Sequence, residues 1–111
     1  MHEFSIAEGI VEAVLERSRG RRPVRINLAI GSFSSVVADS LSFYLDLILE
    51  DRGFPGVEIA VRPVPAGAAC ACGNRYPVSR FTQTCPQCGG LDRKLEGGRE
   101  CIIESAEVED A

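Results

Sequence analysis

The sequence predicts an α+β fold, in which a small mixed sheet carries two helices on one face and a cysteine-rich module projects from it. Three observations lead to this prediction. Apolar residues recur at helical spacing in two segments, strand-like alternation occurs on either side of the second segment, and four of the five cysteines lie between positions 70 and 88. A chain of 111 residues is long enough for one domain with a small appended module.

The first helix is indicated near the N-terminus. Ser5 and Glu8 have the spacing of a capping box, so we expect the helix to begin at Ser5. It should end in the polar run 17–22, before Pro23. The apolar rows expected to face the core are Ile6, Ile10 and Val14, and Ala7, Val11 and Leu15, whereas Glu8, Glu12 and Glu16 should be solvated.

A strand and a second helix follow. Apolar and polar residues alternate over 24–30, which is typical of a half-buried strand. Asp39 or Ser40 should cap a helix that continues through Arg52, because both side chains can accept a hydrogen bond from the first turn. This strand and this helix together are expected between residues 24 and 52.

The remaining elements complete the sheet. Residues 57–61 alternate again and should form a strand that stops at Pro63. Strand, helix, strand in this order predicts a right-handed crossover with parallel strands. The segment 63–69, rich in proline and alanine, is interpreted as a linker, and residues 100–107 as a strand that returns to the sheet. The expected division is an α+β domain of residues 1–66 and 98–111, with a module of residues 67–97 inserted.

The cysteine cluster predicts a metal site. Cys70-x-Cys72 is followed, after twelve residues, by Cys85-x-x-Cys88, and two short-range pairs at such a separation are typical of a zinc ribbon. The first pair is tighter than the usual C-x-x-C, because Ala69 occupies the position that would complete it. Four thiolates fill the tetrahedral shell of Zn²⁺, so the site should be structural and unable to activate water.

Two other interpretations of these cysteines remain open. They could be buried, reduced side chains without a metal, or Cys85 and Cys88 could form a redox dithiol, although a redox dithiol usually opens a helix and Gly89-Gly90 follows here. Cys101 lies outside the cluster and is interpreted as a small core residue.

Composition restricts the function classes. The net charge of −4 argues against nucleic acid as a partner, and no apolar run is long enough to cross a membrane. The acidic N-terminus does not have the pattern of a signal peptide, so we expect a cytoplasmic location with reduced thiols. The chain has no phosphate-binding loop and is not expected to be an enzyme.

A rival function follows from local basic clusters. A zinc ribbon surrounded by such residues can act as an interaction module for protein or nucleic acid. Charged clusters of this kind nevertheless most often only face solvent, without binding a partner. The clusters comprise Arg17, Arg19, Arg21 and Arg22, and, around the cysteine turns, Arg75, Arg80, Arg93 and Lys94.

The first three residues offer a second metal site. The terminal amine of Met1, a backbone amide and the imidazole of His2 can chelate one ion in adjoining five- and six-membered rings, and Glu3 can complete the shell. Deprotonated amides favour square-planar Ni(II) or Cu(II). A solvated terminal histidine is the alternative interpretation, since most histidines bind no metal.

The chain resembles the HypA/HybF family of nickel-insertion accessory proteins along nearly its whole length. Met1-His2-Glu3-Phe4-Ser5 is similar to the start of that family, residues 28–34 to its strand-to-turn segment and residues 40–46 to its second helix. The cysteine quartet and the strand candidate 100–107 stand at the corresponding places.

The resemblance implies a nickel metallochaperone that delivers Ni²⁺, with a partner GTPase, to the precursor of the [NiFe]-hydrogenase large subunit and in some members to urease. It maps the nickel ligands to Met1, His2 and Glu3. It maps the zinc ligands to Cys70, Cys72, Cys85 and Cys88, with a one-residue shift at the first. Some members also carry a supporting carboxylate after the turn; Val37 falls near that place and Asp39, for which we expect a capping role, lies two residues on.

Overall fold

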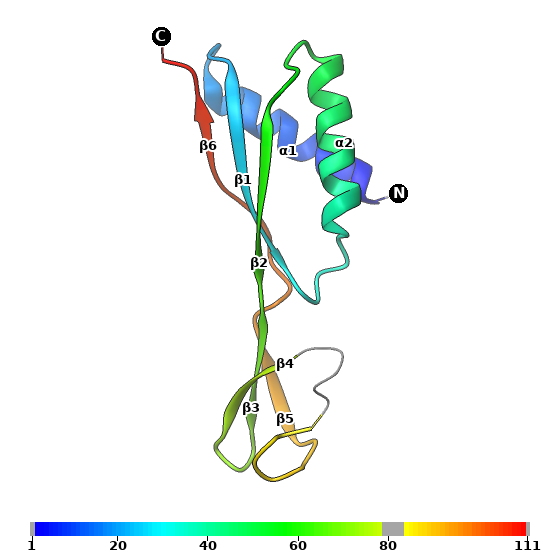
Figure 1. Cartoon of the computed structure of the whole chain (residues 1–111), viewed down its shortest axis with the longest axis vertical. Helices are drawn as coiled ribbons and strands as arrows, with labels where there is room; N and C mark the ends of the chain where they lie inside the picture. The colour runs from blue at the N-terminus through cyan, green and yellow to red at the C-terminus, as the bar shows by residue number, and fades with distance from the viewer. Residues whose placement is uncertain (1, 79–83, 111) are drawn as a thin grey trace.

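The computed structural model describes residues 2–78 and 84–110. These residues form two helices and six strands, namely α1 (His2–Ser18), β1 (Pro23–Gly31), α2 (Ala38–Asp51), β2 (Glu58–Val64), β3 (Ala66–Cys70), β4 (Arg75–Val78), β5 (Arg93–Glu96) and β6 (Cys101–Val108). The strands make two three-stranded sheets, β2-β1-β6 and β4-β3-β5. The molecule is elongated, 55 × 29 × 18 Å, with the helices beside the first sheet and the second sheet at the far end (Figure 1).

The first sheet is mixed, as the sequence predicts. β1 lies in the centre, parallel to β2 and antiparallel to β6. The parallel pairing confirms the strand–helix–strand prediction, and the pairing with β6 confirms that the C-terminal strand returns to this sheet. The α+β prediction is therefore confirmed.

Both helices pack on one face of this sheet. The predicted apolar rows of α1 meet the inward side chains of β1 and of α2, and Glu8, Glu12 and Glu16 are exposed, as predicted. The fully buried side chains at the centre are Val11 from α1, Ile26 and Leu28 from β1, and Leu41, Leu45 and Leu49 from α2.

Both predicted helix caps are wrong. α1 begins at His2, and Ser5 is an exposed residue within it. Tertiary packing extends the helix, because the ring of Phe4 packs edge-on against Tyr44 of α2 with centroids 5.5 Å apart. In α2 the N-cap is Val37, which makes no side-chain cap hydrogen bond, and Asp39 lies in the first turn. Asp39 still favours the helix because a carboxylate stabilises the positive end of its dipole.

The predicted linker is also wrong. β2 continues through Pro63, which pairs with Ile30, and a proline is tolerated there because β2 is an edge strand. Residues 66–70 then form the central strand of the second sheet. Alanine and glycine give this strand too weak an apolar alternation to be recognised, although Ala66 and Ala68 are buried.

The two sheets meet where backbone packs directly on backbone. The amide of Gly31 donates to the carbonyl of Glu100 at 2.6 Å, and the amide of Phe33 donates to the carbonyl of Gly98 at 2.6 Å. Gly98 has φ of 84°, and a Cβ added to it would lie 2.5 Å from the Cβ of Ala66. Only glycine therefore fits at this junction.

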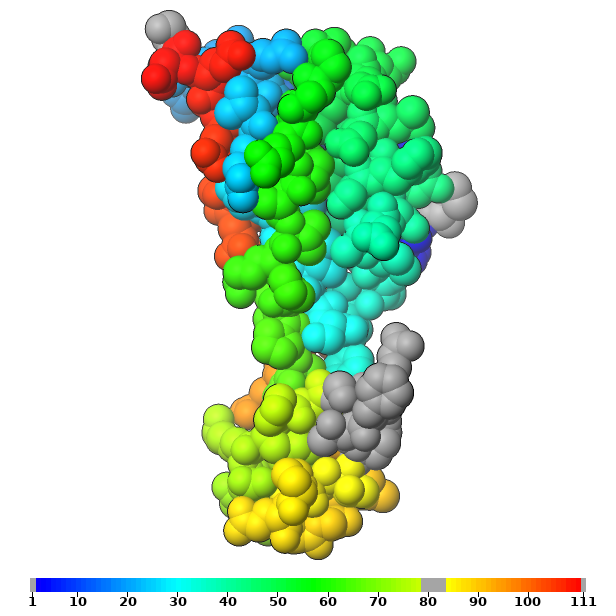
Figure 2. Space-filling model, viewed as in Figure 1, coloured from blue at the N-terminus to red at the C-terminus, as the bar shows by residue number. Residues whose placement is uncertain are grey.

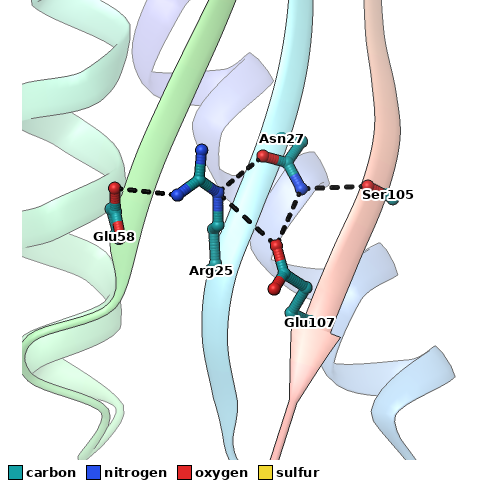
Figure 3. Close-up of polar contacts among 5 residues, drawn as sticks. All are labelled: Arg25, Asn27, Glu58, Ser105 and Glu107. Carbon is teal, nitrogen blue, oxygen red and sulfur yellow. Dashed lines mark hydrogen bonds and ion pairs between the residues drawn. The ribbon is translucent and has the colours of Figure 1, made fainter.

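The sheet face opposite the helices carries a polar network (Figure 3). Arg25 donates to Glu58 at 3.0 Å and lies 3.5 Å from a carboxylate oxygen of Glu107. Asn27 donates to Ser105 at 2.9 Å and accepts from Arg25 at 2.8 Å. These contacts join all three strands, and the guanidinium of Arg25 lies between the carboxylates of Glu58 and Glu107.

We expect Leu45→Ala to lower the free energy of unfolding by about 2–5 kcal/mol, because it leaves a cavity beneath α2. Leu45 is fully buried, whereas Leu47 on the same helix is 50% exposed. Leu47→Ala is the matched control and should change stability by less than about 0.5 kcal/mol. Urea denaturation measures both, and equal effects would contradict the assigned orientation of α2.

Candidate metal centres

Four cysteine sulfurs converge at the tip of the second sheet. The Sγ atoms of Cys70, Cys72, Cys85 and Cys88 all lie within 4.8 Å of one another. The sulfurs of Cys70 and Cys88 lie 3.5 Å apart, and those of Cys72 and Cys85 lie 3.8 Å apart. A tetrahedral site with Zn–S bonds of about 2.3 Å places its sulfurs about 3.8 Å apart, so the quartet fits a tetrahedral thiophilic ion.

Two tight turns present these sulfurs. In the first turn, the amide of Cys70 donates to the carbonyl of Asn74 and the amide of Gly73 donates to the carbonyl of Cys70, both at 2.9 Å. In the second, the amide of Gly89 donates to the carbonyl of Cys85 at 2.8 Å. Gly73 and Gly89 have φ of 96° and 73°, the left-handed conformation that glycine adopts without strain.

Hydrogen bonds to sulfur distinguish the cysteines. The backbone amide of Cys88 is the main cause that lowers the pKa of Cys85 to about 6, and the side chain of Asn74, which donates at 3.6 Å, adds to the effect. The amide of Gly90 donates to Cys88, but the neighbouring sulfurs of Cys70 and Cys72 outweigh it and raise the pKa of Cys88 to about 12. Several thiolates this close need a cation to offset their repulsion.

The arrangement is unlike a redox dithiol. Sulfurs from both turns converge as a quartet within 4.8 Å of one another, whereas a C-x-x-C redox site would need Cys85 and Cys88 alone. All five cysteines are free thiols. Cys101 is partly buried against the main core, and this burial raises its pKa, as for a small core residue.

The second candidate centre is the start of α1. Met1 lies outside the described residues. The Nε2 atom of His2 is 3.0 Å from the backbone carbonyl oxygen of Ser35 and 2.5 Å from Oε2 of Glu3. This Glu3 oxygen is buried and accepts no hydrogen bond of ordinary geometry from the described part of the chain. The His2 side chain is 53% exposed.

These contacts define which ring nitrogen is available to a metal. An Nε2–H group that donates to Ser35 leaves the lone pair of Nδ1 free, and Nδ1 is the nitrogen that closes a six-membered ring with the His2 amide. The first four amides of a helix have no intrahelical acceptor, so those of His2 and Glu3 remain available although the helix begins at His2. Ser35 is 33 residues away, and nothing in the sequence indicates the contact.

The other residues singled out in the sequence lie elsewhere. Within residues 2–78 and 84–110, no hydrogen bond or ion pair joins Asp39 to His2. Arg22 pairs with Glu109 and Arg75 with Glu96, which reduces the basic character of both clusters. Arg80 lies outside the described residues.

The fold and the sulfur cluster define a class: an α+β metal-binding protein with a ribbon-like cysteine module. A family model described as "Hydrogenase/urease nickel incorporation, metallochaperone, hypA" matches residues 1–108. The chain belongs to this HypA family, and the resemblance seen in the sequence is confirmed.

Curated relatives support this membership. The hydrogenase maturation factor HypA of Dehalococcoides mccartyi strain 195 is 34% identical over 114 residues, covering 99% of this chain and 96% of the relative. That of Geobacter metallireducens is 33% identical over 110 residues, covering 98% and 100%. The solution structure of the nickel metallochaperone HypA from Helicobacter pylori has a TM-score of 0.62 at 14% identity, covers 96% of each chain and supports the fold.

The family defines the broad role. The chain functions in nickel incorporation into hydrogenase or urease, as a metallochaperone and maturation factor and not as a catalyst. Neither described helix is long and apolar enough to cross a membrane.

The His2 geometry makes a spectroscopic prediction. In the metal-free protein, neutral His2 should be the Nε2–H tautomer, because Ser35 accepts from Nε2. Nitrogen-15 chemical shifts of the two ring nitrogens distinguish the tautomers. As the chain's one histidine, His2 gives an unambiguous signal. A predominant Nδ1–H tautomer would show that the Ser35 contact does not form in solution.

Proposed function

We propose that this chain binds one Ni²⁺ at its N-terminus through Met1, His2 and Glu3 and delivers it during maturation of [NiFe]-hydrogenase or of urease. The observation that carries the proposal is the contact of His2 Nε2 with the Ser35 carbonyl, which orients the ring and leaves Nδ1 for the metal. Family membership supports nickel as the cargo.

The chemistry of the site suits a carrier. The terminal amine, backbone amides and one imidazole are nitrogen donors that favour a square-planar ion. The half-exposed His2 lets a recipient reach the ion without unfolding the helix. Binding requires loss of protons from the amine and the amides, so nickel affinity should fall as pH decreases.

We propose a separate, structural role for the cysteine quartet, which holds one Zn²⁺ through Cys70, Cys72, Cys85 and Cys88. All four positions of the ion are filled by protein, so this ion stays bound while nickel is exchanged. The zinc organises a module of residues 67–97, and residues 1–66 and 98–111 form the nickel-binding domain.

The partners follow from the cargo. We propose a nickel-handling GTPase of the maturation pathway and the hydrogenase large-subunit precursor, with nucleotide hydrolysis performed by the GTPase. The location proposed is the cytoplasm, where the zinc thiolates remain reduced. Because Arg22 and Arg75 are paired with glutamates of the chain itself, we propose no role in binding nucleic acid.

Substitutions at and near the proposed zinc site should weaken Zn²⁺ binding to different degrees. Cys70→Ser removes a ligand and should weaken Zn²⁺ binding more than Asn74→Ala, which removes one hydrogen bond to Cys85 and should cost roughly 10–100-fold. Cys101→Ser is the matched control and should leave affinity unchanged. Competition with a chromophoric chelator measures all three, and unchanged affinity in Cys70→Ser would contradict the assignment of the fourth ligand.

The nickel site is tested by calorimetric titration of zinc-loaded protein with a native, untagged N-terminus. Wild type should bind one Ni²⁺ per chain, and His2→Ala should lose this binding while it retains zinc. Affinity should decrease below about pH 7.7, the ordinary pKa of a terminal amine. Equal nickel binding by both proteins, or binding by neither, would overturn the N-terminal site and favour a zinc-ribbon interaction module for protein or nucleic acid.

A further inference from the structure

The solvent face of α2 is unusually apolar for a charged helix. Phe43 is 63% exposed and Leu47 is 50% exposed, and they lie one turn apart on the same side. Figure 2 shows α2 uncovered by other elements on this side of the molecule. Exposed aromatic residues of this kind are the usual anchors of protein interfaces.

Carboxylates surround this pair. At 100° per residue, Asp39, Asp46 and Glu50 project within about 60° of Phe43 around the helix axis, and all three are exposed. None of them forms an ion pair with a cation of residues 2–78 or 84–110. α2 itself contains no basic residue.

A hollow lies at one side of the face. Asp46 and Glu50 line a cavity of about 250 Å³ together with Phe54 and Val57. The guanidinium of the chain's own Arg22 already lies 6.0 Å from the centroid of the Phe54 ring. The carboxylates of Asp46 and Glu50 are therefore the groups of this hollow that suit the cationic head of a partner's lysine or arginine. The hollow thus gives the acidic surface a specific place for one basic residue.

This face adjoins the nickel end of the molecule. The ring of Phe4, two residues after His2, packs on Tyr44 at 5.5 Å, and Tyr44 packs on Phe43 at 5.6 Å. A protein that covers Phe43 is therefore placed beside the first turn of α1.

We propose that the exposed face of α2, formed by Asp39, Phe43, Asp46, Leu47 and Glu50, docks the protein that exchanges nickel with the N-terminus, through a surface in which lysine or arginine residues surround an apolar side chain. The location of this partner rests on the proposed nickel site. A second copy using the same face would oppose carboxylates to carboxylates, and an anionic membrane would be repelled.

The test uses the full zinc-loaded chain against two purified probes, the nickel-handling GTPase and the hydrogenase large-subunit precursor, by biolayer interferometry. We expect Phe43→Ser combined with Leu47→Ser to weaken binding of at least one probe roughly tenfold or more. Asp46→Lys combined with Glu50→Lys should also weaken probe binding roughly tenfold or more, and the remaining affinity should depend less on salt concentration. Ile102→Ser, at a residue 52% exposed on a different element, is the matched control and should leave affinity unchanged.

The outcomes separate the two proposals. Helical content by circular dichroism and nickel stoichiometry should be preserved in the α2 variants. Unchanged affinity in both of them, absence of binding by wild type to either probe, or loss of self-association in place of probe binding would overturn the docking face. His2→Ala should keep its affinity for the probes while it loses nickel binding. If His2→Ala still bound nickel, the proposed N-terminal site would be wrong, but the docking result would stand.

Discussion

The backbone turn after β1 is the constraint on which both metal centres depend. Its amides donate to both chain segments that connect the two sheets: Gly31 to Glu100, Ser32 to the carbonyl of Val64, and Phe33 to Gly98. The same turn continues directly to Ser35, whose carbonyl holds His2. One short segment therefore fixes the base of the cysteine module and the orientation of His2, the candidate nickel ligand. The absence of side chains at Gly31 and Gly98 allows the three backbones to approach this closely.

The two sheets have different sources of stability. The first buries two helices against a continuous apolar core. The second core, among the described residues, consists of Ala66, Ala68, Cys70, Tyr76, Val78 and Cys85, two of which are cysteines of the metal cluster. Burial of a core in which only Tyr76 is large releases little free energy, so metal–thiolate bonds at the quartet would supply stability that this core lacks. A metal held by the quartet would consequently be part of the folding of the module and unsuited to the role of a cargo that must leave.

Sequence reasoning succeeded where a local pattern controls the structure. Periodicity predicted α1, α2, β1 and β2, and cysteine spacing predicted a quartet whose sulfurs the fold brings together. It failed where distant contacts decide. The packing of Phe4 on Tyr44 extends α1 beyond the capping box at Ser5, and burial of small residues turns an apparent linker into β3. The contact of His2 with Ser35 arises only after folding brings the end of β1 to the start of α1.

The position of the candidate nickel ligands at a helix N-terminus has a chemical consequence. The amides of the first turn lack carbonyl partners, so their deprotonation breaks no helical hydrogen bond, and the positive end of the helix dipole stabilises the anionic nitrogen that results. A metal bound there can be released by reprotonation, again without unfolding α1. Ser35 and Glu3 contact only one edge of the imidazole, and the side chain of His2 stays half-exposed. Such a site is oriented but not enclosed, so a partner that covered it could add ligands to a bound metal, whereas an ion held by four thiolates would have no open position for such a ligand.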